Sequence, residues 1–273
     1  MSNLLKRAIF GAIYVGLILA ALLLREHLVY MTVFGLLVFL GTWEWSNLVS
    51  THRIFPLRRI TDAVAAVYLF WATHEIADMG IEHAAFLIPY AGYLLYILVR
   101  SIYSERAAMP TDLAKILFGQ VYVGGFLSIA NIFYSDEQTS MILLAIFVCI
   151  WVNDTGAYLA GSTLGRHKLF PSVSPKKSWE GFAGGFIASV LVSGLMLGWE
   201  PLWLLFGVVI SVAGTWGDLF ESMIKRSVGV KDSGNIIPGH GGILDRIDSL
   251  LFVLPFMAFF LWVLQTYQHL HLS

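Results

Sequence analysis

Four residues of the types that bind metal ions or phosphate stand at helical spacing in the last quarter of the chain. Asp218, Glu221, Ser222 and Lys225 fall at i, i+3, i+4 and i+7, which places them on one face of a helix. A solvated amphipathic face would produce the same stripe. Asp218, however, directly follows a wholly apolar run, which favours a functional role at the end of a buried helix.

A second acidic pair follows a glycine-rich stretch. Asp245 and Asp248 are three residues apart, so they face the same way as another helix begins. The preceding Gly239, Gly241 and Gly242 allow the backbone to approach a ligand closely. Carboxylates from two helix ends, surrounded by lysine and arginine, suit a hard divalent cation and a polyphosphate, because Mg²⁺ prefers oxygen ligands and bridges carboxylates to substrate phosphate.

Two polar groups occur earlier in the chain. Asn153 and Asp154 interrupt an apolar segment, where an ionisable residue is costly and indicates function, although a polar pair buried for helix packing is the alternative. Lys176 and Lys177 directly precede Ser178, a candidate N-cap, and lysines at a helix N-terminus favour phosphate binding. An isolated lysine pair could instead contact anionic lipid headgroups.

The composition requires a membrane around these groups. Hydrophobic residues make up 58% of the chain, charged residues 13%, and the mean hydropathy is +0.74. Soluble domains have about 45–50% apolar and about 25% charged residues, so a soluble globule is excluded. We expect an all-α polytopic integral membrane protein with about nine transmembrane helices. The candidate spans are 8–24, 28–44, 60–78, 84–99, 113–133, 140–160, 181–198, 202–221 and 249–267.

The basic residues predict the orientation of these spans. If the N-terminus is cytoplasmic, 16 of the 17 lysines and arginines fall on the cytoplasmic side, and only Arg25 does not. The positive-inside rule therefore favours nine spans, with the N-terminus inside and the C-terminus outside. The polar groups then lie at cytoplasmic helix ends, which predicts phosphoryl-type chemistry at the inner membrane face, on a lipid.

The polar segments also resemble a known family. The 27 residues 222–248, SMIKRSVGVKDSGNIIPGHGGILDRID, are similar to the signature of the phosphatidate cytidylyltransferases, also called CDP-diglyceride synthases. Asn153-Asp154 and residues 174–181, SPKKSWEG, resemble upstream motifs of the same family. Residues 1–110 resemble the family in general character and not through a specific motif.

The resemblance implies a reaction, its cofactors and its site. CTP and phosphatidate would give CDP-diacylglycerol and pyrophosphate in phospholipid biosynthesis, with Mg²⁺ required and direct attack of the lipid phosphate on the α-phosphorus. By analogy Asp218 and Asp245 are the metal ligands, and the catalytic residues are Asp218, Asp245, Asp248, Lys225 and Arg246. The implied substrate-binding residues are Asn153, Asp154, Lys176, Lys177, Ser222, Arg226, Lys231, Asp232, His240, Gly241 and Gly242.

The family resemblance extends to partners and location. It is compatible with a monovalent cation such as K⁺ beside Mg²⁺ and with a homodimer, and it implies no nucleic acid. We expect the protein in the inner (cell) membrane of a bacterium, with the site facing the cytoplasm. Residues 1–110 would form N-terminal transmembrane helices, and residues 111–273 the catalytic region of one continuous membrane domain.

Three other functions and one alternative mechanism remain open at this point. A secondary transporter would place its polar site near the membrane midplane between internal repeats, and no clear repeat is present. A CTP-dependent lipid kinase would release CDP instead of pyrophosphate, and a structural scaffold would not explain the charged cluster. His240 could be a covalent nucleophile. We favour a phosphate contact for it, because the lipid phosphate needs positioning more than activation.

The predicted orientation can be tested with reporter fusions. A phosphatase fused after Gln138 or at Ser273 should be active outside the membrane, whereas fusions after Arg106 or Lys231 should be inactive, because basic loops stay in the cytoplasm. An active fusion at Lys231 would overturn the orientation.

Overall fold

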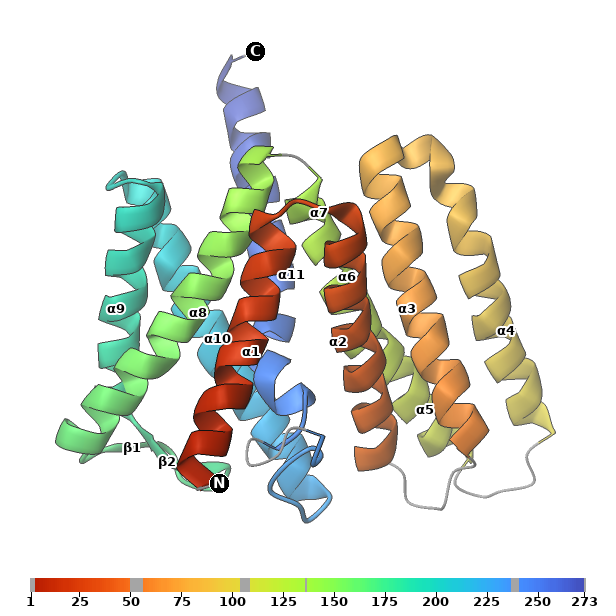
Figure 1. The fold of residues 1–273 in the computed structure, drawn as a ribbon, viewed down its shortest axis with the longest axis horizontal. Helices are drawn as coiled ribbons and strands as arrows, with labels where there is room; N and C mark the ends of the chain where they lie inside the picture. The colour runs from red at the N-terminus through yellow and green to blue at the C-terminus, as the bar shows by residue number, and fades with distance from the viewer. Residues whose placement is uncertain (1–2, 50–55, 104–108, 136, 237–240, 273) are drawn as a thin grey trace. The chain divides into compact units, whose positions relative to one another are not determined.

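The computed structural model describes residues 3–49, 56–103, 109–135, 137–236 and 241–272, and helices dominate it (Figure 1). The first half contains α1 (Asn3–Leu23), α2 (His27–Leu48), α3 (Pro56–Met79), the 3₁₀ helix η1 (Ile81–Leu87), α4 (Ile88–Ile102), α5 (Met109–Gly119), the π-helix η2 (Gln120–Gly125), α6 (Phe126–Ser128) and α7 (Ala130–Tyr134). The second half contains α8 (Glu137–Leu164), β1 (Lys168–Phe170), β2 (Ser174–Ser178), α9 (Trp179–Leu197), α10 (Pro201–Ser227) and α11 (Leu244–Leu272).

Each of the nine predicted apolar segments coincides with a helix or a run of helical turns. Within the described residues, seven helices are long and apolar enough to cross a membrane. The two others are α1, whose described apolar part, Ile9–Leu23, is shorter, and α3, which falls outside the set of seven. The expectation of an all-α polytopic membrane protein is therefore confirmed, while the number of spans and their orientation stay predictions.

The chain forms two compact units. The first unit comprises residues 1–140 and 232–246, and the second comprises residues 141–231 and 247–273. The polar segment that resembles the family signature is thus divided between the units. The expected division of the chain into an N-terminal region, 1–110, and a catalytic region, 111–273, concerns function, and it stays a prediction.

The first unit has an aromatic core with a buried polar link. Tyr30 stacks on Tyr134 with ring centroids 3.6 Å apart, and its hydroxyl donates to Asn131 Oδ1 at 2.9 Å. Asn131 Nδ2 donates in turn to the Phe70 carbonyl at 2.9 Å. These contacts join α2, α3 and α7. Between α3 and η1 the chain turns at Gly80, which has a φ of +107°, a value that glycine adopts readily. This turn separates two apolar segments that the sequence alone does not clearly divide.

Glycines bring α8 and α9 together in the second unit. A Cβ on Gly184 would lie 2.4 Å from the Ala160 Cβ, and a Cβ on Gly185 would lie 2.6 Å from the Asn153 carbonyl oxygen. A Cβ on Gly181 would lie 2.9 Å from the Ala157 carbonyl oxygen. Gly181 and Gly185 thus allow a close approach of the two backbones, and small residues are the usual means of such packing between membrane helices.

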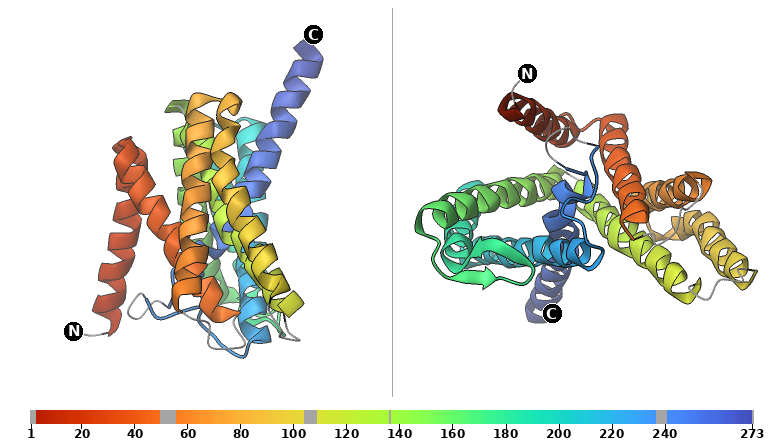
Figure 2. Two further views of the ribbon diagram at one scale, coloured as in Figure 1. Left: turned by 90° about the vertical axis from the view of Figure 1, so that its right-hand side faces the viewer. Right: turned by 90° about the horizontal axis from the view of Figure 1, so that it is seen from below.

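A short antiparallel hairpin connects α8 to α9 (Figure 2). Lys168 of β1 pairs with Ser178 of β2, and the sequence did not predict either strand. Both strands are too short for an alternating pattern to be recognised, which is why only a loop was expected here. The predicted N-cap is confirmed, because the Gly181 amide donates to Ser178 Oγ at 3.1 Å.

The glycine packing predicts a difference between two matched substitutions. Gly184→Leu should lower the melting temperature of the detergent-solubilised protein by several degrees, because overpacking costs about 1–3 kcal/mol. Gly92→Leu on α4 should change it little, since a Cβ there meets nothing within 4 Å. Equal melting temperatures for the two variants would contradict the packing described.

Candidate active site

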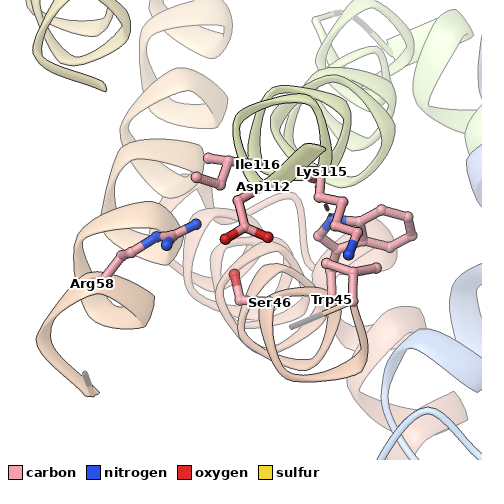
Figure 3. A pocket seen from close by; sticks show the side chains of 7 residues that line it. Trp45, Ser46, Arg58, Asp112, Lys115 and Ile116 are labelled. Carbon is pink, nitrogen blue, oxygen red and sulfur yellow. Dashed lines mark hydrogen bonds between the residues drawn. The ribbon is translucent and has the colours of Figure 1, made fainter. Parts of the chain in front are cut away.

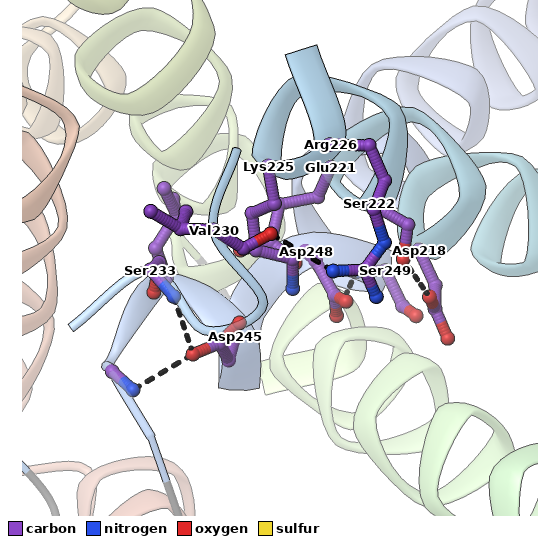
Figure 4. A network of polar contacts seen from close by, with 12 residues as sticks. Asp218, Glu221, Ser222, Lys225, Arg226, Val230, Ser233, Asp245, Asp248 and Ser249 are labelled. Carbon is purple, nitrogen blue, oxygen red and sulfur yellow. Dashed lines mark hydrogen bonds and ion pairs between the residues drawn. The ribbon is translucent and has the colours of Figure 1, made fainter. Parts of the chain in front are cut away.

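The second unit holds an ion pair between the hairpin and α10. Lys177 Nζ on β2 lies 2.8 Å from Asp218 Oδ2. Figure 4 shows the other contact of this carboxylate, in which Ser222 Oγ donates to Asp218 Oδ1 at 3.3 Å. The hairpin therefore brings a lysine to Asp218, the acidic residue for which the family resemblance implies a role as metal ligand. The neighbouring Lys176 is exposed.

The next turn of α10 contains a buried ion pair. Lys225 Nζ donates to Glu221 Oε2 at 2.6 Å, and the Glu221 side chain is fully buried. Burying one of these charges without the other would cost several kcal/mol, so each charge offsets the cost of burying its partner. The predicted stripe on one helix face is confirmed in its geometry, since Asp218 and Ser222 also contact each other.

Asp248 joins the same cluster from α11. It lies within electrostatic reach of Asp218, Glu221 and Asp154, and its Oδ1 accepts a hydrogen bond from the Ser249 amide at 2.7 Å. The approach depends on Gly217, because a Cβ there would lie 2.5 Å from the Asp248 carbonyl oxygen. Helices α8 and α10 thus place three acidic side chains of the second unit where each repels the charge of Asp248 on α11.

Asp245 organises a loop of the first unit. Its Oδ2 accepts hydrogen bonds from the amides of Ser233 at 3.0 Å and Gly242 at 2.8 Å (Figure 4). Gly241 has a φ of +81°, and a Cβ there would lie 2.6 Å from the same oxygen, so glycine is needed for the turn and for the contact. The carboxylate therefore folds the segment on both sides of residues 237–240.

Other predicted residues have structural partners of their own. Asn153 is buried, and its Oδ1 accepts a hydrogen bond from Ser211 Oγ at 2.7 Å, which agrees with the packing alternative and links α8 to α10. Arg226 donates to the Val230 carbonyl at 2.8 Å just beyond α10. Further predicted residues are exposed, namely Asp154, Lys231, Asp232 and Arg246. His240 lies outside the described residues.

The residues of the second unit suit a hard cation in type but do not form a complete cage. Their acidic side chains supply only oxygen ligands, as Mg²⁺ prefers. Over the ranges that the structure describes, no three Asp, Glu, His or Cys side chains converge closely enough to hold a metal ion. Mg²⁺ commonly uses one or two carboxylates, with substrate phosphates and water completing its shell, so the donor set fits such a site.

Sequence reasoning missed two features of the first unit. The first is Glu44 on α2, which is only 2% exposed and contacts the loop that Asp245 organises. A lone acidic residue in an apolar helix was the available signal. The second is a pocket where α2, α3 and α5 meet (Figure 3), lined by Trp45, Ser46, Val49, Arg58, Asp112, Lys115 and Ile116.

Comparison with known proteins decides the family. Residues 5–264 match the cytidylyltransferase family. The chain belongs to this family. The protein is thus a nucleotidyltransferase, and its apolar helices are those of an integral membrane protein.

Relatives from different bacteria support this family membership. The enzyme is 35% identical to the phosphatidate cytidylyltransferase of Staphylococcus aureus (strain COL) over 254 residues, which cover 90% of this chain and 95% of the relative. It is 32% identical to the phosphatidate cytidylyltransferase of Haemophilus influenzae over 285 residues, covering 94% and 98%. The resemblance drawn from the signature is confirmed at the level of the family.

The buried ion pair predicts a separable effect on stability and turnover. Lys225→Met should lower the melting temperature markedly, because it leaves the Glu221 charge buried without its partner at a cost of about 3–5 kcal/mol. The double variant Glu221→Gln, Lys225→Met should regain most of that stability, and its activity then shows whether Lys225 also serves the reaction. A double variant as unstable as the single one would contradict this account of the pair.

Proposed function

We propose that the enzyme is a phosphatidate cytidylyltransferase. A phosphate oxygen of phosphatidate attacks the α-phosphorus of CTP, the bond to the β-phosphate breaks, and pyrophosphate leaves as CDP-diacylglycerol forms. The observation that carries the proposal is the lysine–carboxylate cluster on a membrane-embedded nucleotidyltransferase, in which Lys177 meets Asp218. The names of the bacterial relatives support the choice of lipid.

The metal ligands in this proposal are Asp218 and Asp245, with Asp248 nearby in sequence, and their assignment rests on the family signature. Bound Mg²⁺ would supply charge neutralisation for the phosphates of CTP. Asp218 accepts a hydrogen bond from Ser222 Oγ, and this bond orients the Asp218 carboxylate. Asp245 is fixed by two backbone amides. A K⁺ ion beside Mg²⁺ belongs to the same proposal.

In this proposal, lysines and backbone amides bind the phosphates of the substrates. Lys177 carries a positive charge at the N-terminal end of α9, where the helix dipole also favours phosphate, and Lys176 is exposed beside it. In this proposal both lysines neutralise substrate phosphates, together with Arg226, Lys231 and Arg246. Gly241 and Gly242 would let the backbone approach a phosphate, while Asn153, Asp154 and Asp232 border the substrates.

Direct transfer needs no enzyme-bound intermediate, because phosphatidate brings its own anionic oxygen. In this proposal His240 contacts phosphate. The site faces the cytoplasm, where CTP is present, from the inner membrane of a bacterium, and the enzyme works as a homodimer. A secondary transporter is disfavoured by the family membership, whereas a CTP-dependent lipid kinase differs in its products.

Product analysis tests the function. Purified enzyme incubated with CTP, Mg²⁺ and phosphatidate should release pyrophosphate and form a cytidine-containing lipid in equal amounts. Release of CDP with a phosphorylated lipid would overturn the proposal in favour of a kinase. Labelled pyrophosphate should not exchange into CTP without lipid, and robust exchange that His240→Ala abolishes would instead make His240 the nucleophile.

Conservative substitutions test the metal ligands. Asp218→Asn and Asp245→Asn each keep the shape of the side chain while removing its charge, so membrane insertion should survive. Turnover should fall at least about 100-fold, since a lost ligand removes several kcal/mol of transition-state stabilisation. Asp112→Asn, an acidic residue of the separate pocket in the first unit, is the matched control and should retain activity. Near-normal turnover of Asp245→Asn at ordinary Mg²⁺ would refute its assignment.

A further inference from the structure

Glu44 is an acidic residue for which the proposed chemistry has so far given no role. It lies in α2, one of the helices apolar enough to cross a membrane, and is 2% exposed. Burying a carboxylate in such a helix is costly unless the group is hydrogen-bonded, and such residues are usually retained for function. Its contacts lie within the first unit and involve residues far away in sequence.

Glu44 binds the beginning of α11. Its Oε2 accepts a hydrogen bond from the Leu244 amide at 2.8 Å. Leu244 is the first residue of α11, and the first amides of a helix have no partner within the helix itself. A negative charge at this end is also favoured by the helix dipole. The carboxylate therefore caps α11 directly before Asp245.

Glu44 also binds the other end of the loop that Asp245 organises. Ser233 Oγ donates to Glu44 Oε2 at 3.3 Å. A Cβ on Gly234 would lie 2.4 Å from Glu44 Oε1, and a Cβ on Gly242 would lie 2.3 Å from Oε2. Both sides of the loop thus pack against one carboxylate, and glycine at 234 is explained by this contact.

Glu44 and Asp245 both bind the chain around Ser233 and Gly242. Asp245 holds the amides of Ser233 and Gly242, while Glu44 holds the Ser233 hydroxyl and the Leu244 amide. The orientation of Asp245 depends on the loop conformation, and that conformation depends on an anchor in α2. Losing the anchor would free the loop without removing any of the predicted metal or phosphate contacts.

We propose that Glu44 is a positioning residue for cytidylyl transfer, which anchors Ser233 and Leu244 to α2 and thereby sets the orientation of Asp245. This inference rests on the proposed function for its kinetic consequence and on the first unit alone for its structural one. Displacing a reacting group by about 1 Å can cost about 100-fold in rate. The effect should therefore appear in kcat, with a smaller change in the KM for CTP.

The first test is Glu44→Gln in the full-length, detergent-solubilised enzyme. Gln cannot offer a charged oxygen to both donors, so amide hydrogen exchange in the peptide covering residues 230–246 should accelerate about tenfold, with other helices unchanged. The kcat for pyrophosphate release from CTP and phosphatidate should fall between tenfold and about 100-fold. Asp62→Asn is the matched control. Asp62 is also buried in a helix of the first unit, but its Oδ1 accepts a hydrogen bond from the Tyr93 hydroxyl and from none of the described residues in 230–246.

A second test does not depend on the folding of Glu44→Gln. Gly234→Ala should lower kcat, because the new methyl group pushes against Glu44 Oε1. Glu44→Ala removes the carboxylate that this methyl group meets, so adding Gly234→Ala to Glu44→Ala should lower kcat no further. Independent, multiplicative effects of the two changes would count against the contact as the cause.

The outcomes separate the two proposals. Wild-type kcat in Glu44→Gln, or a loss of activity matched by faster exchange in all helices, would overturn the positioning role. Exchange is measured without substrate, so it tests the anchor even if the wild-type enzyme makes no CDP-diacylglycerol. That last result would refute the proposed function and leave the anchor of the loop to be judged by exchange alone.

Discussion

The cost of placing charge among apolar helices governs this structure. A carboxylate that is fully or partly withdrawn from water needs a partner, and the partners differ from site to site: Lys225 for the buried Glu221, Lys177 for the partly exposed Asp218, and backbone amides for Asp245. Each pairing fixes a side chain and the element that carries it. The same requirement that keeps the fold stable therefore holds acidic groups in defined orientations, which a nucleotidyltransferase needs before any substrate arrives.

Glycine makes these pairings geometrically possible. Gly217 allows the α10 backbone to approach Asp248, and Gly184 and Gly185 allow α9 to approach α8. In the first unit, Gly234 and Gly242 leave room for the Glu44 carboxylate. Gly234, Gly241 and Gly242 of the family signature thus have internal packing reasons in addition to any contact with phosphate, and a substitution at these positions acts first on the placement of the loop.

The two units contribute different kinds of support. In the second unit a hairpin and three helices gather lysines and carboxylates, and lysines pair with two of the carboxylates, Asp218 and Glu221. In the first unit Glu44 and Asp245 bind mainly backbone amides, so they determine the path of the chain. A charge-neutralising variant should therefore alter electrostatics in the second unit and loop conformation in the first.

The sequence by itself determined the helical membrane architecture, the Ser178 cap and the acidic stripe on α10, because hydrophobic periodicity and capping are local properties of the chain. It also determined the family, since 27 residues at fixed spacing are specific. Only the tertiary structure revealed the Lys177–Asp218 pair, the β1–β2 hairpin and the anchor at Glu44. These depend on contacts between residues up to 200 positions apart. No local pattern encodes the Lys177–Asp218 pair or the Glu44 anchor, because they are decided by which elements pack together, whereas the strands of the hairpin are too short to show an alternating pattern.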